Sequence, residues 1–242
     1  MNLFSKKTPT MCWLFVAFFA LLSSPYINAQ SCPPAQTGCT PEATFTTTVV
    51  PQGYPTCTLT VTYKLRVCQG EFQIYGISVS QLGMGCNQYL TDVIALFLAN
   101  PIDVNEQGAF IRRFFRSTYA QIGDQLFNIA VAGGPADLYL CDNPNSKLFT
   151  ATFYNGSCSS ICVGLNNSTG SIVITPVNCG NTCCKYERTY CIDPITGLTK
   201  VVETTTEATP GNCFSLPAPA CGAETGVTPL FQGPCLPVCS SN

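Results

Sequence analysis

CTLTVTYKLRVCQGEFQIYGISV, residues 57–79, carries the clearest folding signal in the chain. Apolar residues occupy every second position on both sides of Gln69-Gly70, which is the period of a strand with one buried face. A two-residue turn at Gln69-Gly70 places Val67 opposite Phe72, so the apolar rows of both arms lie on the same side. The segment therefore predicts an antiparallel β-hairpin.

The hydrophobic period changes to about 3.6 residues between positions 86 and 132, which predicts two helices. The first ends at Asn100-Pro101, because the residue before a proline disfavours helical geometry. The second begins where Asp103 can cap the first turn, with Glu106 three residues on, and it ends at Gly133-Gly134-Pro135. We expect its apolar stripe to lie on the apolar face of the hairpin. The stripe consists of Phe110, Ile111, Phe114, Phe115, Tyr119, Ile122, Leu126 and Ile129.

The remainder of the chain reads as short strands and an irregular tail. Strands are expected at residues 148–154, 161–165 and 171–177, and in a hairpin over 184–207 that turns at 193–197. Past residue 211, proline, glycine and cysteine interrupt every pattern. No regular structure is expected there, and disulfides must anchor the tail.

These elements predict an α+β protein, with an N-terminal antiparallel sheet packed by two helices and a disulfide-rich, all-β or irregular C-terminal part. Cysteine density rises along the chain, which suggests a boundary near residues 154–156. The expected organisation is a signal peptide over 1–29, an α+β domain over 30–154 and a cysteine-rich β region with a proline-rich tail over 155–242. In the α+β domain, strands fall at about 43–79 and helices at about 86–132.

The first 29 residues have the pattern of a secretory signal peptide. Lys6 and Lys7 form a positive end, residues 12–22 are almost wholly apolar, and Ala29 ends a cleavage site. No later stretch approaches the roughly 20 consecutive apolar residues that a membrane helix needs. We therefore expect a secreted protein, extracellular or periplasmic after removal of the leader, with no membrane span. Lipid attachment at Cys32 is a weaker alternative.

Sixteen cysteines follow the leader, an even number that suits structural disulfides in an exported protein. The close spacings within 158–162 and 179–184 are also compatible with a metal cluster, but the oxidising compartment favours disulfides. Adjacent Cys183 and Cys184 should point to opposite faces of a strand and join different partners. Spacing alone leaves the pairing open. The cysteines are Cys32, Cys39, Cys57, Cys68, Cys86, Cys141, Cys158, Cys162, Cys179, Cys183, Cys184, Cys191, Cys213, Cys221, Cys235 and Cys239.

Composition excludes several classes of function. Without the leader, nine basic residues face thirteen acidic ones, a net charge near −4, which disfavours nucleic acid as a partner. Histidine, the commonest general base and metal ligand, is absent. No catalytic motif is present, no cofactor or metal is indicated, and the sequence leans away from an enzyme.

Two groups of residues are candidates for contact with a partner. Tyr186, Arg188 and Tyr190 lie on one side of a predicted strand and form the preferred candidate contact surface, because exposed aromatic rings can stack on sugars. The alternative is that the tyrosines pack inward. Arg112, Arg113 and Arg116 form a basic cluster that could meet an anionic partner, although the simpler interpretation is a solvated helix face.

The leading hypothesis for function is a secreted or surface-associated, disulfide-stabilised binding or structural protein whose partner is an extracellular protein or a glycan. A second is an inhibitor or toxin-like antagonist that presents a rigid loop, at residues 217–219 or 193–197. A third is a hydrolase that works through two carboxylates. Glu71 and Asp92 are acids that could serve that chemistry, and both are more simply surface charges.

Overall fold

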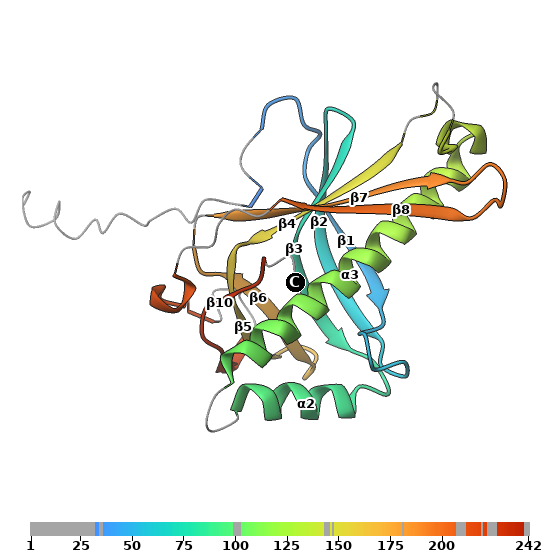
Figure 1. Cartoon of the computed structure of the whole chain (residues 1–242). Coiled ribbons are helices and arrows are strands. Elements are labelled where there is room, and N and C mark those ends of the chain that lie inside the picture. Colours follow the sequence, from blue (N-terminus) through green and yellow to red (C-terminus); the bar gives the residue numbers. More distant parts are fainter. Residues whose placement is uncertain are drawn as a thin grey trace, which may run out of the picture.

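The computed structural model describes residues 32–33, 36–98, 103–142, 146, 148–180, 182–206, 212–218, 220–221 and 227–239. Over these residues the chain forms one mixed sheet of ten strands with two long helices, α2 and α3, on one side of it (Figure 1). The α+β class is therefore correct, although strands predominate. The predicted leader and the Asn100-Pro101 stop lie outside the described residues. The strands are β1 (Ala43–Val49), β2 (Leu59–Cys68), β3 (Glu71–Leu82), β4 (Phe149–Gly156), β5 (Cys158–Asn166), β6 (Ile172–Asn178), β7 (Cys183–Ile192), β8 (Thr199–Thr206), β9 (Val227–Gln232) and β10 (Leu236–Pro237). The helices are α2 (Asn87–Leu98) and α3 (Val104–Gly133), with short 3-10 turns η1 (Ala136–Tyr139) and η2 (Cys213–Ser215).

Strands β2 and β3 form the predicted hairpin. Val67 pairs with Phe72, and Cys68 pairs with Glu71 across the turn, as the alternation of apolar residues indicated. Gln69 and Gly70 both adopt positive φ, at 53° and 88°. Two positive φ values are what a two-residue type I′ turn requires, and its twist matches the twist of the strands it joins.

The N-terminal strands do not form a sheet of their own. Strand β2 pairs with one edge of β3 along its length. The other edge of β3 holds β4 in parallel over residues 72–74 and β6 in antiparallel fashion at Val79. The sheet therefore divides at β3 into a branch β4-β7-β8 and a branch β6-β5 that continues to β9 and β10. Segments of high and low cysteine density thus share one sheet and one main core.

Helix α3 crosses this sheet and carries the core (Figure 1). Asp103 caps it by accepting hydrogen bonds from the backbone N–H groups of Asn105 and Glu106, as expected. Tyr119 stacks on Phe153 with ring centroids 4.6 Å apart, and Phe127 stacks on Tyr190 at 5.1 Å. The helix therefore packs against β4 and β7 as well as β1 and β10, and not on the β2–β3 hairpin alone.

The predicted stripe is wrong at its C-terminal end. Ile129 is 68 % exposed, whereas Phe127, which the pattern omitted, is 2 % exposed. The change arises because the last turns of the helix pack on β7, where Phe127 stacks on Tyr190, and not on the hairpin. Leu126 is only half-buried in consequence.

Glutamines of α3 close the free edge of the sheet at β1. Gln121 donates from Nε2 to the carbonyl oxygen of Val50 at 2.8 Å and accepts from the Val50 N–H at 2.8 Å. One turn on, Gln125 donates to the carbonyl oxygen of Thr48 at 3.2 Å. These side chains replace the bonds that another strand would make, which protects an edge that could otherwise pair with a second chain.

The tail past residue 211 has more regular structure than its composition predicts. Strands β9 and β10 both pair with the outer edge of β5. Pro229 is accommodated because it lies beside a register shift on an edge strand, where a missing N–H is tolerated. The expectation that disulfides anchor this tail is confirmed. Its four cysteines join the sheet through Cys158–Cys213, Cys162–Cys221, Cys179–Cys235 and Cys184–Cys239.

The other disulfides complete the pairing of the sixteen cysteines that the structure describes. Adjacent Cys183 and Cys184 join different partners, as expected: Cys183 binds Cys32 near the start of the described chain, and Cys184 binds Cys239 near its end. The sulfurs of the close-spaced clusters are thus in disulfides, not in a metal centre. The remaining pairs are Cys39–Cys68, Cys57–Cys86 and Cys141–Cys191.

A test of the helix–sheet contact is Gly123→Ala. An added Cβ at this position would overlap the hydroxyl of Tyr190, whose ring is fully buried. We expect a loss of about 1–3 kcal/mol in unfolding free energy, measured by guanidinium unfolding of the oxidised protein. Gly133→Ala, in the same helix with open space around its Cβ, is the matched control and should be neutral or slightly stabilising. Equal stability of both variants would contradict the close approach.

Removal of the Cys158–Cys213 disulfide, whose two residues are each 2 % exposed, tests how the tail is held. We expect the double variant Cys158→Ser/Cys213→Ser to lose about 2–5 kcal/mol of stability and to be cleaved by protease in the segment around residue 213. Cys39→Ser/Cys68→Ser serves as control, because it leaves all four tail bridges intact. A tail equally resistant in both variants would show that strand pairing alone holds it.

Candidate functional site

The residues that the sequence suggested as a contact surface are buried. Tyr186 is 8 % exposed, Arg188 7 % and Tyr190 0 %. They lie on the face of β7 that packs against α3, where Tyr186 and Tyr190 contact Tyr119 and Phe127. The inward-packed alternative is therefore the correct one, because β7 is covered by the helix and does not present this face to solvent.

Arg188 is the centre of a buried polar network. Its Nε donates to the Tyr190 hydroxyl at 2.8 Å, its Nη1 pairs with Glu203, and its Nη2 lies 3.4 Å from Asp124 Oδ1. Two carboxylates, one from β8 and one from α3, thus compensate the guanidinium. Burial raises the pKa of Tyr190, so its hydroxyl stays protonated. The network joins the helix to the hairpin and is structural.

The turn of the β7–β8 hairpin, a candidate inhibitor loop, is organised by Asp193. Its carboxylate accepts from the N–H groups of Ile195 at 2.8 Å and Thr196 at 3.1 Å, and from Lys200 Nζ at 2.7 Å. These bonds lower the pKa of Asp193 to about 2, with the Lys200 bond as the largest cause. The turn is rigid at its base and exposes Ile195, which is 91 % accessible.

A cleft of about 390 Å³ lies between α2, α3 and the loop that follows β1. Aromatic rings form its walls, and a few polar groups converge on it, which is the usual composition of a binding site. Its lining residues are Pro51, Gln52, Gly53, Tyr54, Gln88, Tyr89, Asp92, Phe110, Arg113 and Phe114.

Local interactions hold the cleft open in this shape. The loop turns with a bond from the Tyr54 N–H to the Pro51 carbonyl at 3.0 Å, and Gly53 supplies a φ of 88°. The Cys57–Cys86 disulfide then ties the end of the loop to the start of α2. Tyr54 packs edge-on against Tyr89, with centroids 5.1 Å apart. The walls are therefore fixed before any ligand arrives.

Asp92 is the polar centre of the cleft. Its Oδ2 accepts from the Tyr54 hydroxyl at 2.8 Å, and its Oδ1 accepts from Gln88 Nε2 at 2.7 Å. Desolvation, and then the bond to Asp92, raise the pKa of Tyr54. Arg113 stands exposed at the rim and provides the cation of the site. The cleft thus offers a fixed carboxylate, amides, a guanidinium and ring faces in one place.

The sequence pattern does not indicate this cleft. In the sequence Asp92 has the character of a surface charge, and nothing links it to Tyr54, which lies 38 positions away along the chain. Gln88 and Asp92 are one helical turn apart, a spacing that could have indicated a shared polar group on α2. Their meeting with the loop depends on the Cys57–Cys86 pairing, which spacing does not determine.

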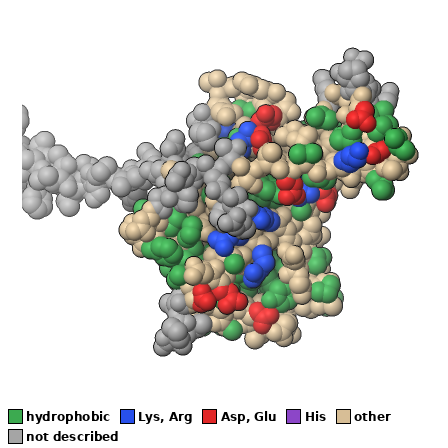
Figure 2. All heavy atoms as spheres, viewed as in Figure 1, with side chains coloured by type: hydrophobic (Ala, Val, Ile, Leu, Met, Phe, Trp, Pro, Cys, Tyr) green, Lys and Arg blue, Asp and Glu red, His purple; other side chains and the backbone are tan. Residues whose placement is uncertain are grey.

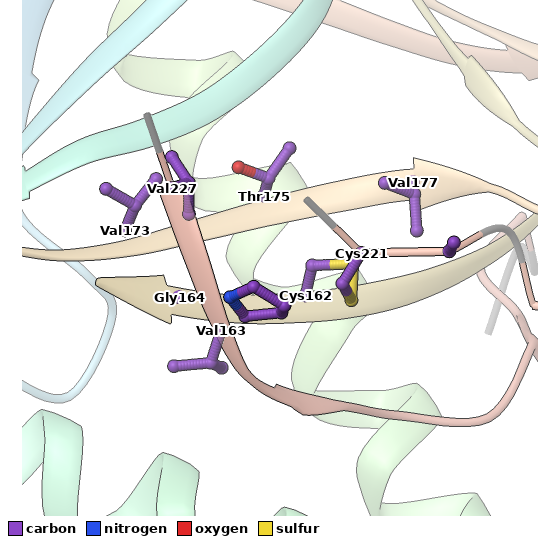
Figure 3. A pocket seen from close by; sticks show the side chains of 10 residues that line it. Cys162, Val163, Gly164, Val173, Thr175, Val177, Cys221 and Val227 are labelled. Carbon is purple, nitrogen blue, oxygen red and sulfur yellow. A yellow bond between two sulfur atoms is a disulfide. The ribbon is translucent and has the colours of Figure 1, made fainter. Parts of the chain in front are cut away.

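A second hollow, of about 150 Å³, lies between β6 and the tail (Figure 3). Val173 and Val177 point into it from β6, and the Cys162–Cys221 disulfide borders it. Its lining contains no ionisable side chain among the described residues, so it offers apolar contact but little chemistry to orient a ligand.

Comparison with known proteins gives no relative. No protein-family model matches the chain, and neither a curated protein nor a solved structure is significantly similar to it. Within the described residues, no helix has the length and apolar character needed to cross a membrane. The eight disulfides fit a disulfide-stabilised extracellular protein.

The Asp193 turn gives a prediction about pH. Because the folded pKa of about 2 lies below the ordinary value of 3.8, the carboxylate stabilises the turn above pH 3.8. That contribution should fade as the pH falls from 3.8 towards 2. Carbon-detected NMR titration of the side-chain carboxyl checks this, and Asp193→Asn should abolish the acid-induced change at Ile195. A midpoint near 3.8 would contradict the network of bonds.

Proposed function

We propose that this chain is an exported, disulfide-stabilised glycan-binding protein, whose leader over residues 1–29 is removed and whose binding site is the cleft at Asp92. The eight disulfides and the sparsely charged composition support an extracellular setting, where neutral polar surfaces and covalent cross-links are common. The proposal replaces Tyr186, Arg188 and Tyr190 as the contact surface with the residues of the cleft.

The observation that carries the proposal is the joint presence of ring faces and planar polar groups in one cleft. A sugar ring has an apolar C–H face that packs on an aromatic ring and hydroxyl groups around its edge. Asp92 and the amides of Gln52 and Gln88 supply acceptors and donors for such hydroxyls. Half-buried Tyr54 and Phe110 supply the platform. A purely apolar ligand would make no use of these polar groups.

Binding fits the cleft better than hydrolysis does. Glycoside hydrolysis usually needs two carboxyl groups, about 5–10 Å apart, on opposite sides of the scissile bond. The lining contains one carboxylate, Asp92, among the described residues. That carboxylate accepts two hydrogen bonds, from Tyr54 and Gln88, which fix its position in the cleft. A carboxylate held in this way is placed to accept hydrogen bonds from the hydroxyl groups of a sugar.

The β7–β8 hairpin supports a second candidate function, an antagonist that inserts a rigid loop into another protein. The hairpin projects from the body of the molecule, and its tip exposes Ile195 and Leu198, which are 91 % and 68 % accessible (Figure 1). The Cys141–Cys191 disulfide braces its base. A partner captured in this way would be lost with Ile195→Ser and retained with Asp92→Asn.

Glycan-array binding of the oxidised protein, followed by calorimetry with the best binder, tests the proposal. Asp92→Asn and Tyr54→Phe should each lower affinity about tenfold, because each removes or weakens a charge-assisted hydrogen bond at the site. Asp142→Asn, at an exposed acid outside the cleft, is the matched control and should bind normally. Near-UV circular dichroism checks that all variants keep the native packing.

Two results would overturn the proposal. The first is silence of the folded protein across the array. The second is glycan binding that is unchanged in both Asp92→Asn and Tyr54→Phe, which would place any sugar site elsewhere.

A further inference from the structure

Arg112, Arg113 and Arg116 form a basic patch on the outer side of α3. Figure 2 shows basic side chains gathered over this helix, with acidic side chains over α2 and the start of α3. Arg113 and Arg116 are exposed, and Arg112 is half-buried. The helical spacing puts all three within about 100° of the helix circumference, opposite the buried side that holds Ile111 and Phe114.

This positive patch stands against the overall charge of the protein, which is negative. The neighbouring guanidinium groups act on one another: burial, then Arg116 and Arg113, lower the pKa of Arg112. Neither Arg112 nor Arg113 forms an ion pair with a residue that the structure describes. Clustered like charges cost free energy, and an anion that binds between them removes that cost.

One guanidinium of the patch, that of Arg112, is also held in place by the tail. Arg112 Nη1 donates to the carbonyl oxygen of Pro237 at 3.2 Å, which attaches its guanidinium to the disulfide-anchored tail. Gly108 lets this side chain lie against the helix, since a Cβ there would come within 3.3 Å of the same Nη1. A guanidinium held in place loses less entropy on binding than a free one.

The basic patch adjoins the cleft, because the two share Arg113. Arg113 belongs to the lining of the cleft itself, whereas Arg112 and Arg116 line a smaller hollow, of about 40 Å³, beside Phe115 and Tyr119. Arg113 and Arg116 are separated by a rise of about 4.5 Å along α3. A ligand whose sugar ring occupies the cleft could therefore bring an anionic substituent, or the next charged unit, over the arginines.

We propose that the ligand of the cleft is an acidic saccharide, whose anionic group binds the guanidinium groups of Arg113 and Arg116. This inference rests on the proposed glycan-binding function and specifies its ligand class. Carboxylate, sulfate and phosphate groups all match a guanidinium fork, so the shared chemistry is a planar or tetrahedral oxyanion on a sugar. An acidic peptide would match the arginines but lacks the hydroxylated ring that the Asp92 carboxylate and the ring faces of the cleft suit.

The test uses four oligosaccharide probes of matched length with the full oxidised protein. They are oligogalacturonate, its fully methyl-esterified form, a sulfated oligosaccharide and a phosphorylated mannose oligosaccharide. We expect oligogalacturonate to bind at least tenfold more tightly than its ester, in which a neutral methyl ester replaces each carboxylate. The sulfated and phosphorylated probes then show which oxyanion the patch prefers.

Variants connect the preference to the patch. Arg113→Gln and Arg116→Gln should each weaken oligogalacturonate binding about tenfold, and Arg116→Gln, which lies outside the cleft lining, should leave binding of the methyl ester unchanged. Lys64→Gln removes the same charge from an exposed site on β2 and is the matched control. Raising the salt concentration should weaken binding of the acid form in the native protein and much less in Arg113→Gln.

The outcomes separate this inference from the function on which it rests. If no saccharide binds, the glycan-binding function itself is wrong. If the acid and its ester bind equally, or if Arg113→Gln and Arg116→Gln bind the acid as tightly as the native protein, the function stands and the acidic ligand is refuted. Competition by poly-glutamate stronger than by any acidic saccharide would also overturn the proposal in favour of an acidic protein partner.

Discussion

Burial of the aromatic side of α3 is the interaction on which the rest of the molecule depends. Tyr119 and Phe127 pack on β4 and β7, neighbouring strands in one branch of a sheet that divides at β3, and the helix also contacts β10 of the other branch. Such rings contribute most when they are fully removed from water, and Gly123 permits this by letting Tyr190 approach the helix backbone. Once that side is fixed, the rotation of the helix is fixed too. The glutamines then face the β1 edge, and the arginines face solvent.

The disulfides act where this core ends. The tail after residue 211 contributes few large apolar side chains, and its strands β9 and β10 only border β5. Without cross-links the ordering entropy of such a segment would exceed what its contacts return. Four disulfides remove much of that cost in advance. The fixed tail in turn provides Pro237, whose carbonyl accepts a hydrogen bond from Arg112 on the outer side of α3.

How well a feature could be predicted from the sequence depends on how far apart its interacting residues lie along the chain. The Gln69-Gly70 turn and the Asp103 cap depend on neighbours a few positions away, and both were predicted correctly. The parallel contact of β4 with β3 joins segments about 79 positions apart and carries no local signature. The same limit explains Tyr186 and Tyr190: alternation shows that they share a face, but not that α3 covers it. The cleft at Asp92 was hidden for the same reason, since it needs a loop, two helices and one particular disulfide.

Sparse charge makes the position of each charged group informative. Arg188 is buried and has Glu203 and Asp124 within reach, so its charge serves the interior. Arg113 carries the same charge on an exposed rim, beside a carboxylate that is already engaged with Tyr54 and Gln88. A surface that is otherwise solubilised by neutral polar side chains does not need a cluster of three arginines for solubility. The physical basis of the proposed acidic ligand is therefore the contrast between Arg188, whose charge is compensated by two carboxylates, and the arginines that cluster on the outer side of α3.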